Sequence, residues 1–450
     1  MKDKEKKKEI LENAPEWVMG INSIDEIAYG TEYLEQFPML CVNDKLFDVD
    51  GEVDMKYVSY RISQDILPYV RNNFSNRVKS LIEAIKLLCY GSELPLDEFR
   101  IHLKNGTLDV DGTFTEKKYF CRNRLNVEYK EFIGEAYYPE KFMTFLYDLL
   151  EPEDVETLQE YLGYCLIPST RGQKMMFIVG NGGEGKSRIG VVLQSIFGKN
   201  MLTGSFQRIE SDRFFRYNLQ DKLLMVDDDM QMNALMSTGY IKNLITAETP
   251  VDVEAKGEQS YQAKLYSRFL CFGNGSPKAL YDKTDGFARR LIILTTKPKS
   301  ENRIDDPFIA DKFIAEKEKI FRWMYDGLKR LIDRKLRFTI SNKTKLNISE
   351  ALSDNCNITE FLSDGDIVSF NPDFRVTGAE LYSSYSVWCG DNALTALKRD
   401  TFISWLKTNQ KKLGICYDSN ILDDRGNRVR GFKGIKTNRK TTCLKSCVAV

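Results

Sequence analysis

MMFIVGNGGEGKSRI, residues Met175 to Ile189, is the stretch that decides the fold, because an apolar strand, a glycine-rich turn and a helix start follow one another in it. Gly180 to Ser187 matches the pattern G-x-x-x-x-G-K-[ST] without a gap. Glycines let successive backbone N–H groups turn inward, and the helix adds the partial positive charge of its N-terminus. The pattern therefore predicts a cradle for a triphosphate.

Each position of this cradle has an expected role. Lys186 would neutralise the β and γ oxygens of the triphosphate, and the Ser187 hydroxyl would join the coordination shell of Mg²⁺. We therefore expect ATP and Mg²⁺ as cofactors. The alternative, a glycine-rich turn with an unrelated lysine, is disfavoured because strand, loop and helix occur in register. The other nucleotide-binding positions are Gly180, Asn181, Gly182, Gly183, Glu184 and Gly185.

A second apolar strand, Lys222 to Val226, runs into three carboxylates, Asp227, Asp228 and Asp229. Like charges so close together raise one another's pKa, and a Mg²⁺ ion at the strand tip would balance them. One carboxylate would orient the metal, and its neighbour would position or deprotonate the attacking water. The alternative is an acidic surface turn.

A third strand, Phe269 to Phe272, leads to Asn274. In ring-forming P-loop ATPases, a polar side chain at the tip of the strand between the other two contacts the γ-phosphate and the attacking water, and Asn274 is the candidate here. Two arginines, Arg289 and Arg290, open the next apolar strand. They are awkward to bury in a monomer, and they would act as an arginine finger if they projected across a subunit boundary. The alternative is a surface ion pair.

The segment from Thr246 to Tyr266 predicts a β-hairpin that turns at Gly257 and carries Lys256 and Lys264. In a ring, such a hairpin could enter the central channel and follow a phosphate backbone. The alternative is a hairpin that is merely exposed.

These motifs, in this order, resemble those of superfamily 3 helicases, above all the helicase parts of phage, plasmid and poxvirus primase-helicases. The resemblance covers roughly residues 45 to 300. It implies a P-loop ATPase core of the AAA+ type that assembles as a hexamer around DNA, with nucleotide bound between subunits. Arg290 is then the better finger candidate and Arg289 the second.

The resemblance leaves two points open. The family has an acidic pair where this chain has a triplet. Counting from Lys222 favours Asp228 and Asp229, whereas counting from the strand end favours Asp227 and Asp228, with Asp227 and Asp228 as metal candidates beside Ser187. Larger members also carry a primase domain upstream. We expect none here, so a primase or polymerase would be a separate partner.

The C-terminal part predicts two helices with aromatic faces, Ala379 to Trp388 and Arg399 to Leu413, followed by a basic hairpin, which is the outline of a winged helix. From Leu397 onward there are 13 basic and four acidic residues. Such an excess on a neutral protein is typical of a phosphate-facing surface. We expect DNA contacts from Arg428, Arg430 and Lys433. The alternative is a solvated basic tail.

The composition argues against a zinc protein, a disulfide-rich protein and a membrane protein. The 65 basic and 65 acidic residues cancel, so net charge gives no information about partners. Ten cysteines without a C-x-x-C pair, and the single histidine His102, do not indicate a zinc site or a disulfide framework. No stretch approaches the roughly 18 to 20 apolar residues of a membrane span, so we expect a soluble protein without a membrane partner.

The predicted fold class is α/β, with a mixed α+β module before the ATPase core and a winged-helix-like domain after it. The predicted parts are a charged segment 1–40, an α+β module 41–139, a helical collar 140–165, an ATPase domain 166–345 and a DNA-binding domain 346–450.

The predicted function is that of an ATP-dependent replicative DNA helicase or translocase of a phage, plasmid or other mobile element, working as a hexameric ring on single- and double-stranded DNA in the host cytoplasm. The alternative is an ATP-regulated protein that binds a replication origin without processive unwinding. A metabolite kinase is disfavoured, because the glycine-rich loop lies in mid-chain and no lid for a second substrate is apparent.

Overall fold

The structure is a computed structural model, and the residues that it describes form two compact units. The first takes in the described residues up to Gly275 and those from Asp285 to Asn347, and the second begins at Ile348. In the described ranges no helix combines the length and the apolar composition that crossing a membrane requires. These ranges are 11–131, 137–231, 238–247, 249–275, 285–299, 306–353, 357–392, 394, 396–423 and 425–438.

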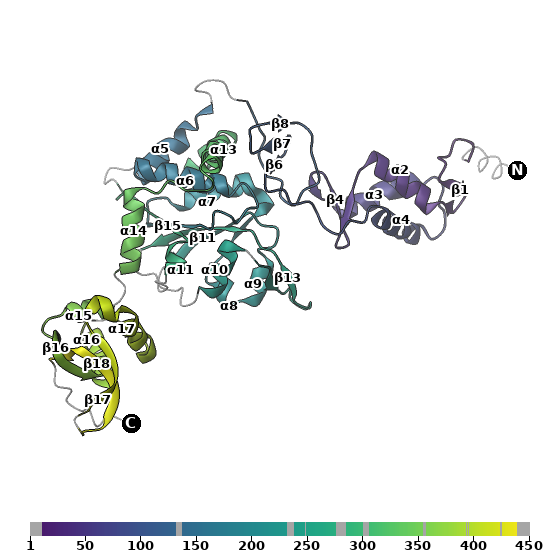
Figure 1. Cartoon of the computed structure of the whole chain (residues 1–450). Helices are drawn as coiled ribbons and strands as arrows, with labels where there is room; N and C mark the ends of the chain where they lie inside the picture. The colour runs from purple at the N-terminus through teal and green to yellow at the C-terminus, as the bar shows by residue number, and fades with distance from the viewer. Residues whose placement is uncertain are drawn as a thin grey trace. The chain divides into compact units, whose positions relative to one another are not determined.

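A five-stranded parallel sheet forms the centre of the first unit (Figure 1). The strand order is β10-β11-β14-β9-β15, so β14 lies between β11 and β9. Apart from the acidic residues of β11, the strands are mostly apolar, as expected for a sheet that is covered on both faces. Their bounds are β9 (Met175–Gly180), β10 (Met201–Thr203), β11 (Leu224–Gln231), β14 (Arg268–Asn274) and β15 (Leu291–Thr295).

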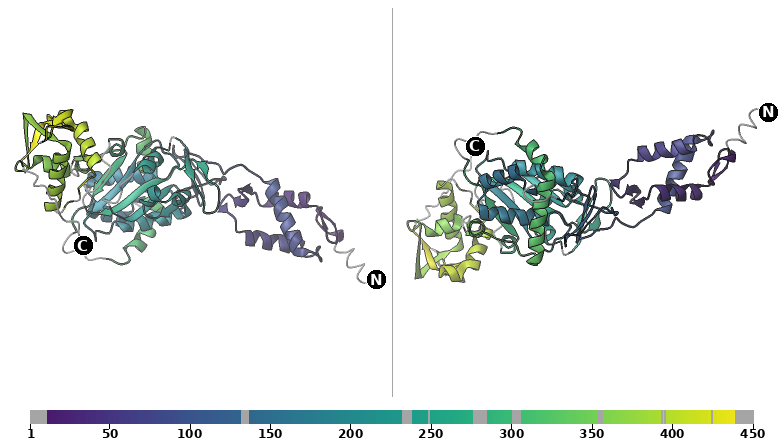
Figure 2. Two further views of the ribbon diagram at one scale, coloured as in Figure 1. Left: turned by 90° about the horizontal axis from the view of Figure 1, so that it is seen from below. Right: turned by 90° about the horizontal axis from the view of Figure 1, so that it is seen from above.

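Helices cover both faces of this sheet (Figures 1 and 2). One face carries α5 (Glu140–Leu149), α6 (Pro152–Tyr164), α7 (Ser187–Phe197), α12 (Ile309–Ile314) and α13 (Lys317–Asp333). The remaining elements of the sheet region are η2 (Gly198–Asn200), α8 (Arg208–Ser211), α9 (Arg213–Tyr217), α10 (Gly239–Thr246), α11 (Asp285–Ala288) and α14 (Asn342–Ser353).

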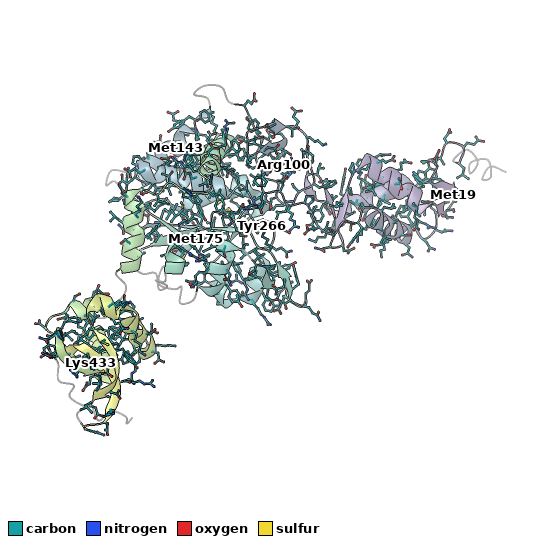
Figure 3. All side chains as sticks on the ribbon, in the orientation of Figure 1. Met19, Arg100, Met143, Met175, Tyr266 and Lys433 are labelled. Atoms are coloured by element: carbon teal, nitrogen blue, oxygen red, sulfur yellow. The ribbon has the colours of Figure 1, made fainter. Side chains whose placement is uncertain are left out.

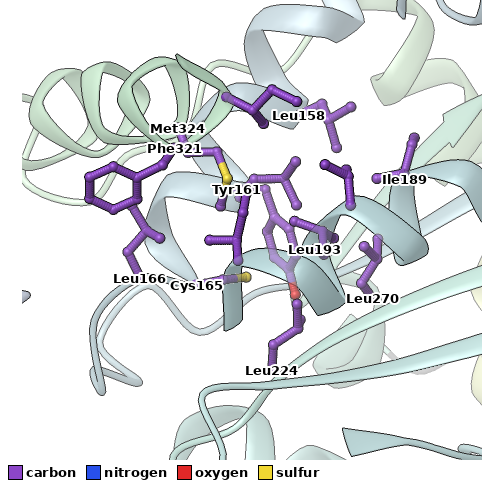
Figure 4. Close-up of a cluster of buried hydrophobic side chains, with 14 of the residues drawn as sticks. Leu158, Tyr161, Cys165, Leu166, Ile189, Leu193, Leu224, Leu270, Phe321 and Met324 are labelled. Carbon is purple, nitrogen blue, oxygen red and sulfur yellow. The ribbon is translucent and has the colours of Figure 1, made fainter. Parts of the chain in front are cut away.

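The two helices before the glycine-rich loop belong to the same core as the sheet. Figure 4 shows side chains of α6, α7 and α13 meeting those of β11 and β14. Tyr161 of α6 is fully buried and donates its hydroxyl hydrogen to the carbonyl oxygen of Phe269 at 2.6 Å. The expected collar is therefore packed on the sheet and shares its hydrophobic core.

The backbones of α6 and α13 approach each other closely at two glycines. A Cβ atom added to Gly163 would lie 2.3 Å from the carbonyl oxygen of Met324, and one added to Gly327 would lie 2.5 Å from that of Gln159. Both contacts are with backbone, which cannot move aside as a flexible side chain can. The crossing of these helices therefore requires glycine on each of them.

The predicted lysine hairpin is confirmed. β12 (Val251–Val253) and β13 (Tyr261–Ala263) pair antiparallel, with Val253 opposite Tyr261. Gly257 has φ of +88°, a value that favours glycine at this turn.

The N-terminal residues build a small helical core of their own. Its apolar side chains run from Trp17 to Ile85, so the segment before residue 41 packs with the segment after it. The sequence indicated only a charged segment over residues 1–40. Within it, Val18–Gly20 pairs as a strand with Ser23–Ile24. The elements are β1 (Val18–Gly20), β2 (Ser23–Ile24), α2 (Glu26–Gln36), β3 (Leu40–Val42), β4 (Lys45–Asp48), β5 (Gly51–Glu52), α3 (Met55–Ile66) and α4 (Phe74–Leu88).

A three-stranded antiparallel sheet follows, made of β6 (Arg100–Leu103), β7 (Gly106–Asp109) and β8 (Phe114–Thr115). A hairpin turn at Asn105 and Gly106, a residue pair typical of such turns, joins the first two strands. His102 is 6% exposed on β6 and therefore packs within this part of the structure.

The second unit has the order α15-β16-α16-α17-β17-β18, with a small antiparallel sheet in the strand order β16-β18-β17. Both predicted helices and both predicted strands are present. The sequence missed α15 and β16. Thr377 and Glu380 form a capping box at the start of α16. The bounds are α15 (Asn357–Ser363), β16 (Val368–Thr377), α16 (Gly378–Asp391), α17 (Arg399–Leu413), β17 (Cys416–Leu422) and β18 (Arg428–Thr437).

Candidate functional site

The glycine-rich loop lies between the end of β9 at Gly180 and the start of α7 at Ser187. Three of its glycines have positive φ: 101° at Gly182, 79° at Gly183 and 92° at Gly185. A side chain at these positions would strain the backbone. Because the loop follows the carboxyl end of a parallel strand and precedes a helix, it occupies the place where α/β sheets bind ligands.

Lys186 turns its ammonium group into the site and not toward solvent. The residue is 7% exposed, and Nζ donates to Oε2 of Glu184 at 2.7 Å and to Oδ1 of Asn274 at 3.1 Å. Asn274 is the last residue of β14, and its backbone pairs with Gly180 of β9. Two of the predicted residues, which lie far apart in the sequence, therefore meet at the loop.

Glu184 is the functional residue that sequence reasoning underestimated, since it was counted only as a variable position of the loop. Its side chain is buried and accepts hydrogen bonds from the backbone N–H groups of Asn181 at 2.5 Å and Gly182 at 3.1 Å. Burial alone would raise the pKa of this carboxyl. The hydrogen bonds from Lys186 and the loop backbone outweigh burial, and the pKa lies below its usual value. The residue type at this position was the only signal in the sequence.

The three acidic residues lie within β11, which continues to Gln231, and not beyond its end as the sequence indicated. Asp227 is buried, and its Oδ2 accepts the N–H of Phe206 at 2.6 Å. Burial raises the pKa of Asp227, against the effect of this hydrogen bond. Asp228 and Asp229 are exposed. The pairing with β14 is irregular between Asp227 and Met230, so the backbone bulges where the carboxylates emerge.

The donors expected for Mg²⁺ are hard oxygen ligands of the kind that this ion prefers. Ser187 is exposed at the first position of α7, and Asp228 and Asp229 are exposed on β11. Asp227 has its carboxylate committed to backbone N–H groups. Among the described residues, no three His, Cys, Asp or Glu side chains converge as a metal centre. By donor type alone, the Ser187 hydroxyl and the carboxylates of Asp228 and Asp229 would suit an ion whose remaining ligands are phosphate and water.

The two arginines lie between α11 and β15 and differ in environment. Arg289 is exposed. Arg290 is partly buried, and its Nη1 donates to the carbonyl oxygen of Gly286. The carbonyl of Arg290 accepts the N–H of Met175 at 2.9 Å, which anchors this segment to the start of β9.

The residues expected to contact DNA lie on the two units. Lys256 and Lys264 are exposed on and beside the hairpin of the first unit. Arg428 and Arg430 are exposed two residues apart on β18 of the second. Lys433, labelled in Figure 3, is engaged in an ion pair with Asp418, with 2.5 Å between Nζ and Oδ2.

The described residues define an α/β protein with a parallel sheet and a glycine-rich loop at the carboxyl ends of its strands. Residues 178–290 match the model of a family described as a family of unknown function, DUF5906. No curated protein matches the chain.

Solved structures with a similar fold include three of the NrS-1 C-terminal region, each 12% identical in sequence. One, an A form apo structure of residues 305–718, has a TM-score of 0.50 and covers 91% of this chain and 99% of that one. An apo structure has a TM-score of 0.49 with the same coverage. A further A form apo structure has a TM-score of 0.48 and covers 86% of each chain. At this identity the likeness concerns the fold alone.

Proposed function

We propose that the chain is an ATP hydrolase with a P-loop core of the AAA+ type, and that it drives movement along DNA. The observation that carries the proposal is the meeting of Lys186 and Asn274, whose Nζ and Oδ1 atoms are 3.1 Å apart. One group comes from the glycine-rich loop after β9 and the other from the tip of β14, which lies between β9 and the acidic strand β11. A P-loop ATPase of this type needs the glycine-rich loop, the polar strand tip and the acidic strand side by side in this order.

In this proposal the loop backbone and Lys186 bind the β- and γ-phosphates. Ser187 would help to hold Mg²⁺, and the ion would supply positive charge against the charge that develops on the phosphates. The burial of Asp227 against Phe206 favours Asp228 and Asp229 as the carboxylates that orient the metal and the attacking water. Asn274 would hold the attacking water or the γ-phosphate. Asp227 would then hold the backbone that positions its neighbours.

The proposed oligomerisation is argued from the arginines. Neither Arg289 nor Arg290 is fully buried. A second copy of the chain could receive either side chain at its own nucleotide, in a ring that is a hexamer in the superfamily that the motifs resemble. Hydrolysis would then be coupled between neighbouring subunits.

DNA is the proposed polymer substrate. The hairpin β12–β13 carries the exposed Lys256 near its turn, and the second unit carries the exposed Arg428 and Arg430. The order of helices and strands in the second unit supports a winged helix, in which the β17–β18 connection is the wing. Together these features favour a replicative helicase or translocase of a phage, plasmid or other mobile element.

The alternative is an origin-binding initiator that uses ATP only to lock an assembled state. The excess of basic residues from Leu397 onward favours it, because a winged helix can bind duplex DNA without unwinding. Strand displacement on a forked DNA substrate separates the two, since an initiator of this kind would bind the fork and hydrolyse ATP without releasing the strand.

The test of the enzyme itself is ATP turnover by the full chain, with and without single-stranded DNA, beside the Lys186→Ala variant. We expect DNA to stimulate the wild type and the variant to lose turnover while keeping its circular dichroism spectrum. Normal turnover in Lys186→Ala would refute the site. Turnover that DNA leaves unchanged would refute the coupling to DNA.

A further inference from the structure

The Glu184 carboxylate occupies the donors that the proposed function assigns to phosphate. Its oxygens accept from the N–H of Asn181 at 2.5 Å, the N–H of Gly182 at 3.1 Å and Nζ of Lys186 at 2.7 Å. Two backbone N–H groups and an ammonium on one anionic group are the arrangement by which a loop of this kind holds an anion. The chain thus supplies an anion of its own.

The site that this carboxylate occupies is enclosed by the protein. Glu184 is 3% exposed and Lys186 is 7% exposed. A buried carboxylate or ammonium is costly unless it is paired and hydrogen-bonded, and here each charge satisfies the other. Asn274 completes the enclosure by accepting a second hydrogen from Lys186. A nucleotide phosphate needs the same donors, and they cannot serve both anions with full geometry.

We propose that Glu184 is the intramolecular occupant of the phosphate cradle in the nucleotide-free chain, and that a nucleoside triphosphate binds by displacing its carboxylate from Asn181, Gly182 and Lys186. The inference rests on the proposed function for the identity of the ligand. It makes Glu184 an autoinhibitory residue.

Displacement selects for ligands with several phosphates. A single phosphate exchanges one anion for another on the same donors and leaves the Glu184 charge beside it. A triphosphate adds further oxygens, a bound Mg²⁺ and contacts along the loop, and these offset the broken ion pair. Glu184 therefore raises the threshold for binding and widens the difference in affinity between triphosphate and monophosphate.

A purely structural role for Glu184 predicts the opposite result. If the carboxylate only kept the loop in shape, then its removal would loosen the loop and weaken nucleotide binding. If it competes with phosphate, then its removal strengthens binding. The direction of the change in Kd therefore distinguishes the two roles.

The experiment uses the full chain as wild type and Glu184→Gln, which keeps the size of the side chain and removes its charge. Glu35→Gln, on the exposed face of α2, is the matched control for net charge. Calorimetric titrations with ATP, AMP and tripolyphosphate give the dissociation constants. We expect Glu184→Gln to bind ATP and tripolyphosphate about tenfold more tightly, because one competing charge-assisted hydrogen bond is removed. AMP should gain more than ATP, so that the difference in affinity between the two narrows, and Glu35→Gln should match the wild type.

A second measurement needs no nucleotide. The melting temperatures of the wild type, Glu184→Gln, Lys186→Met and the double variant form a double-mutant cycle. We expect the melting temperature of the double variant to fall by less than the sum of the two single falls, because the ion pair couples the two residues. Additive losses would overturn the inference, and so would equal or weaker ATP binding by Glu184→Gln, while the proposed function would stand. A third result is possible: Glu184 and Lys186 are coupled in the melting temperatures, but neither the wild type nor any variant binds ATP or tripolyphosphate. That result would overturn both the proposed function and the displacement of Glu184 by phosphate.

Discussion

Lys186 and Asn274 are joined by a hydrogen bond of 3.1 Å between Nζ and Oδ1, although 88 residues separate them in the sequence. The bond connects the loop after β9 to the tip of the adjacent strand β14, so the position of the ammonium group depends on the register of the sheet. It also brings the amide of Asn274 next to the ammonium group that we propose to bind phosphate.

Asn274→Ala should reduce ATP turnover more than nucleotide binding. Loss of the amide removes the group proposed to hold the attacking water, and the fall in kcat should be on the order of 10²-fold, as for other preorganised polar groups. The dissociation constant should change less than about threefold, because the loop backbone and Lys186 remain. Steady-state turnover measures kcat, and calorimetric titration measures the dissociation constant. A variant with full kcat would show that Asn274 only supports the loop.

Arg290→Ala should abolish hydrolysis and spare nucleotide binding, with a loss of about 10³-fold in turnover if the arginine acts as a finger. Arg289→Ala, which removes the adjacent arginine, is the comparison variant. Mixing Arg290→Ala with Lys186→Ala should restore part of the activity, because some interfaces then combine an intact loop with an intact arginine. Absence of recovery would argue against action between subunits. A larger loss in Arg289→Ala would assign the role to the exposed arginine.

Arg428→Ala and Arg430→Ala should each lower the salt dependence of duplex DNA binding. Removing one cation that neutralises a phosphate reduces the slope of log K against log[salt] by about 0.9. Lys433→Ala should change the slope less, because Asp418 already neutralises that ammonium at 2.5 Å. Fluorescence anisotropy at a series of salt concentrations measures the slopes. Equal reductions for all three variants would contradict the difference that the ion pair predicts.

Gly163→Ala and Gly327→Ala should each destabilise the first unit by about 3 kcal/mol, since the added methyl group meets the backbone of the opposite helix. Gly239→Ala is the control, because a Cβ there meets nothing within 4 Å. Its effect should stay within about 0.5 kcal/mol. Denaturant unfolding of the full chain measures the three. Small effects at Gly163 and Gly327 would show that α6 and α13 separate at low cost.

His102 should make stability depend on pH. Burial first, and the positive charge of Arg124 second, lower its pKa from 6.5 to about 4. Protonation is therefore disfavoured in the folded state. The contribution to stability is complete above pH 6.5 and is lost as the pH falls toward 4, by up to about 1.4 kcal/mol per unit.

The measurement for His102 is direct because the chain has one histidine. With labelled histidine, one imidazole should titrate by NMR with a midpoint near pH 4. His102→Gln should flatten the fall in melting temperature between pH 6.5 and 5. A midpoint near 6.5 would show that solvent reaches the ring.

Much of the fold could be predicted because it depends on local patterns. Gly182, Gly183 and Gly185 are needed for positive φ wherever the loop lies, and the turn at Gly257 follows the same rule. The strand β16 was missed because Asn371 and Pro372 interrupt its alternation, and its pairing with β18 is irregular between Phe370 and Arg375. Tertiary pairing overrode the local turn signal there.

The sequence by itself determined the glycine-rich loop, the apolar strands beside it and the type of each candidate group, because backbone conformation and hydrophobic periodicity are encoded by neighbouring residues. Only the tertiary structure decided which of those groups meet. It put β14 between β9 and β11, so that Asn274 reaches Lys186. It buried Asp227 against Phe206 and turned Glu184 into the loop. Such contacts depend on strand order and on competition for a few buried donors, and no local pattern records either.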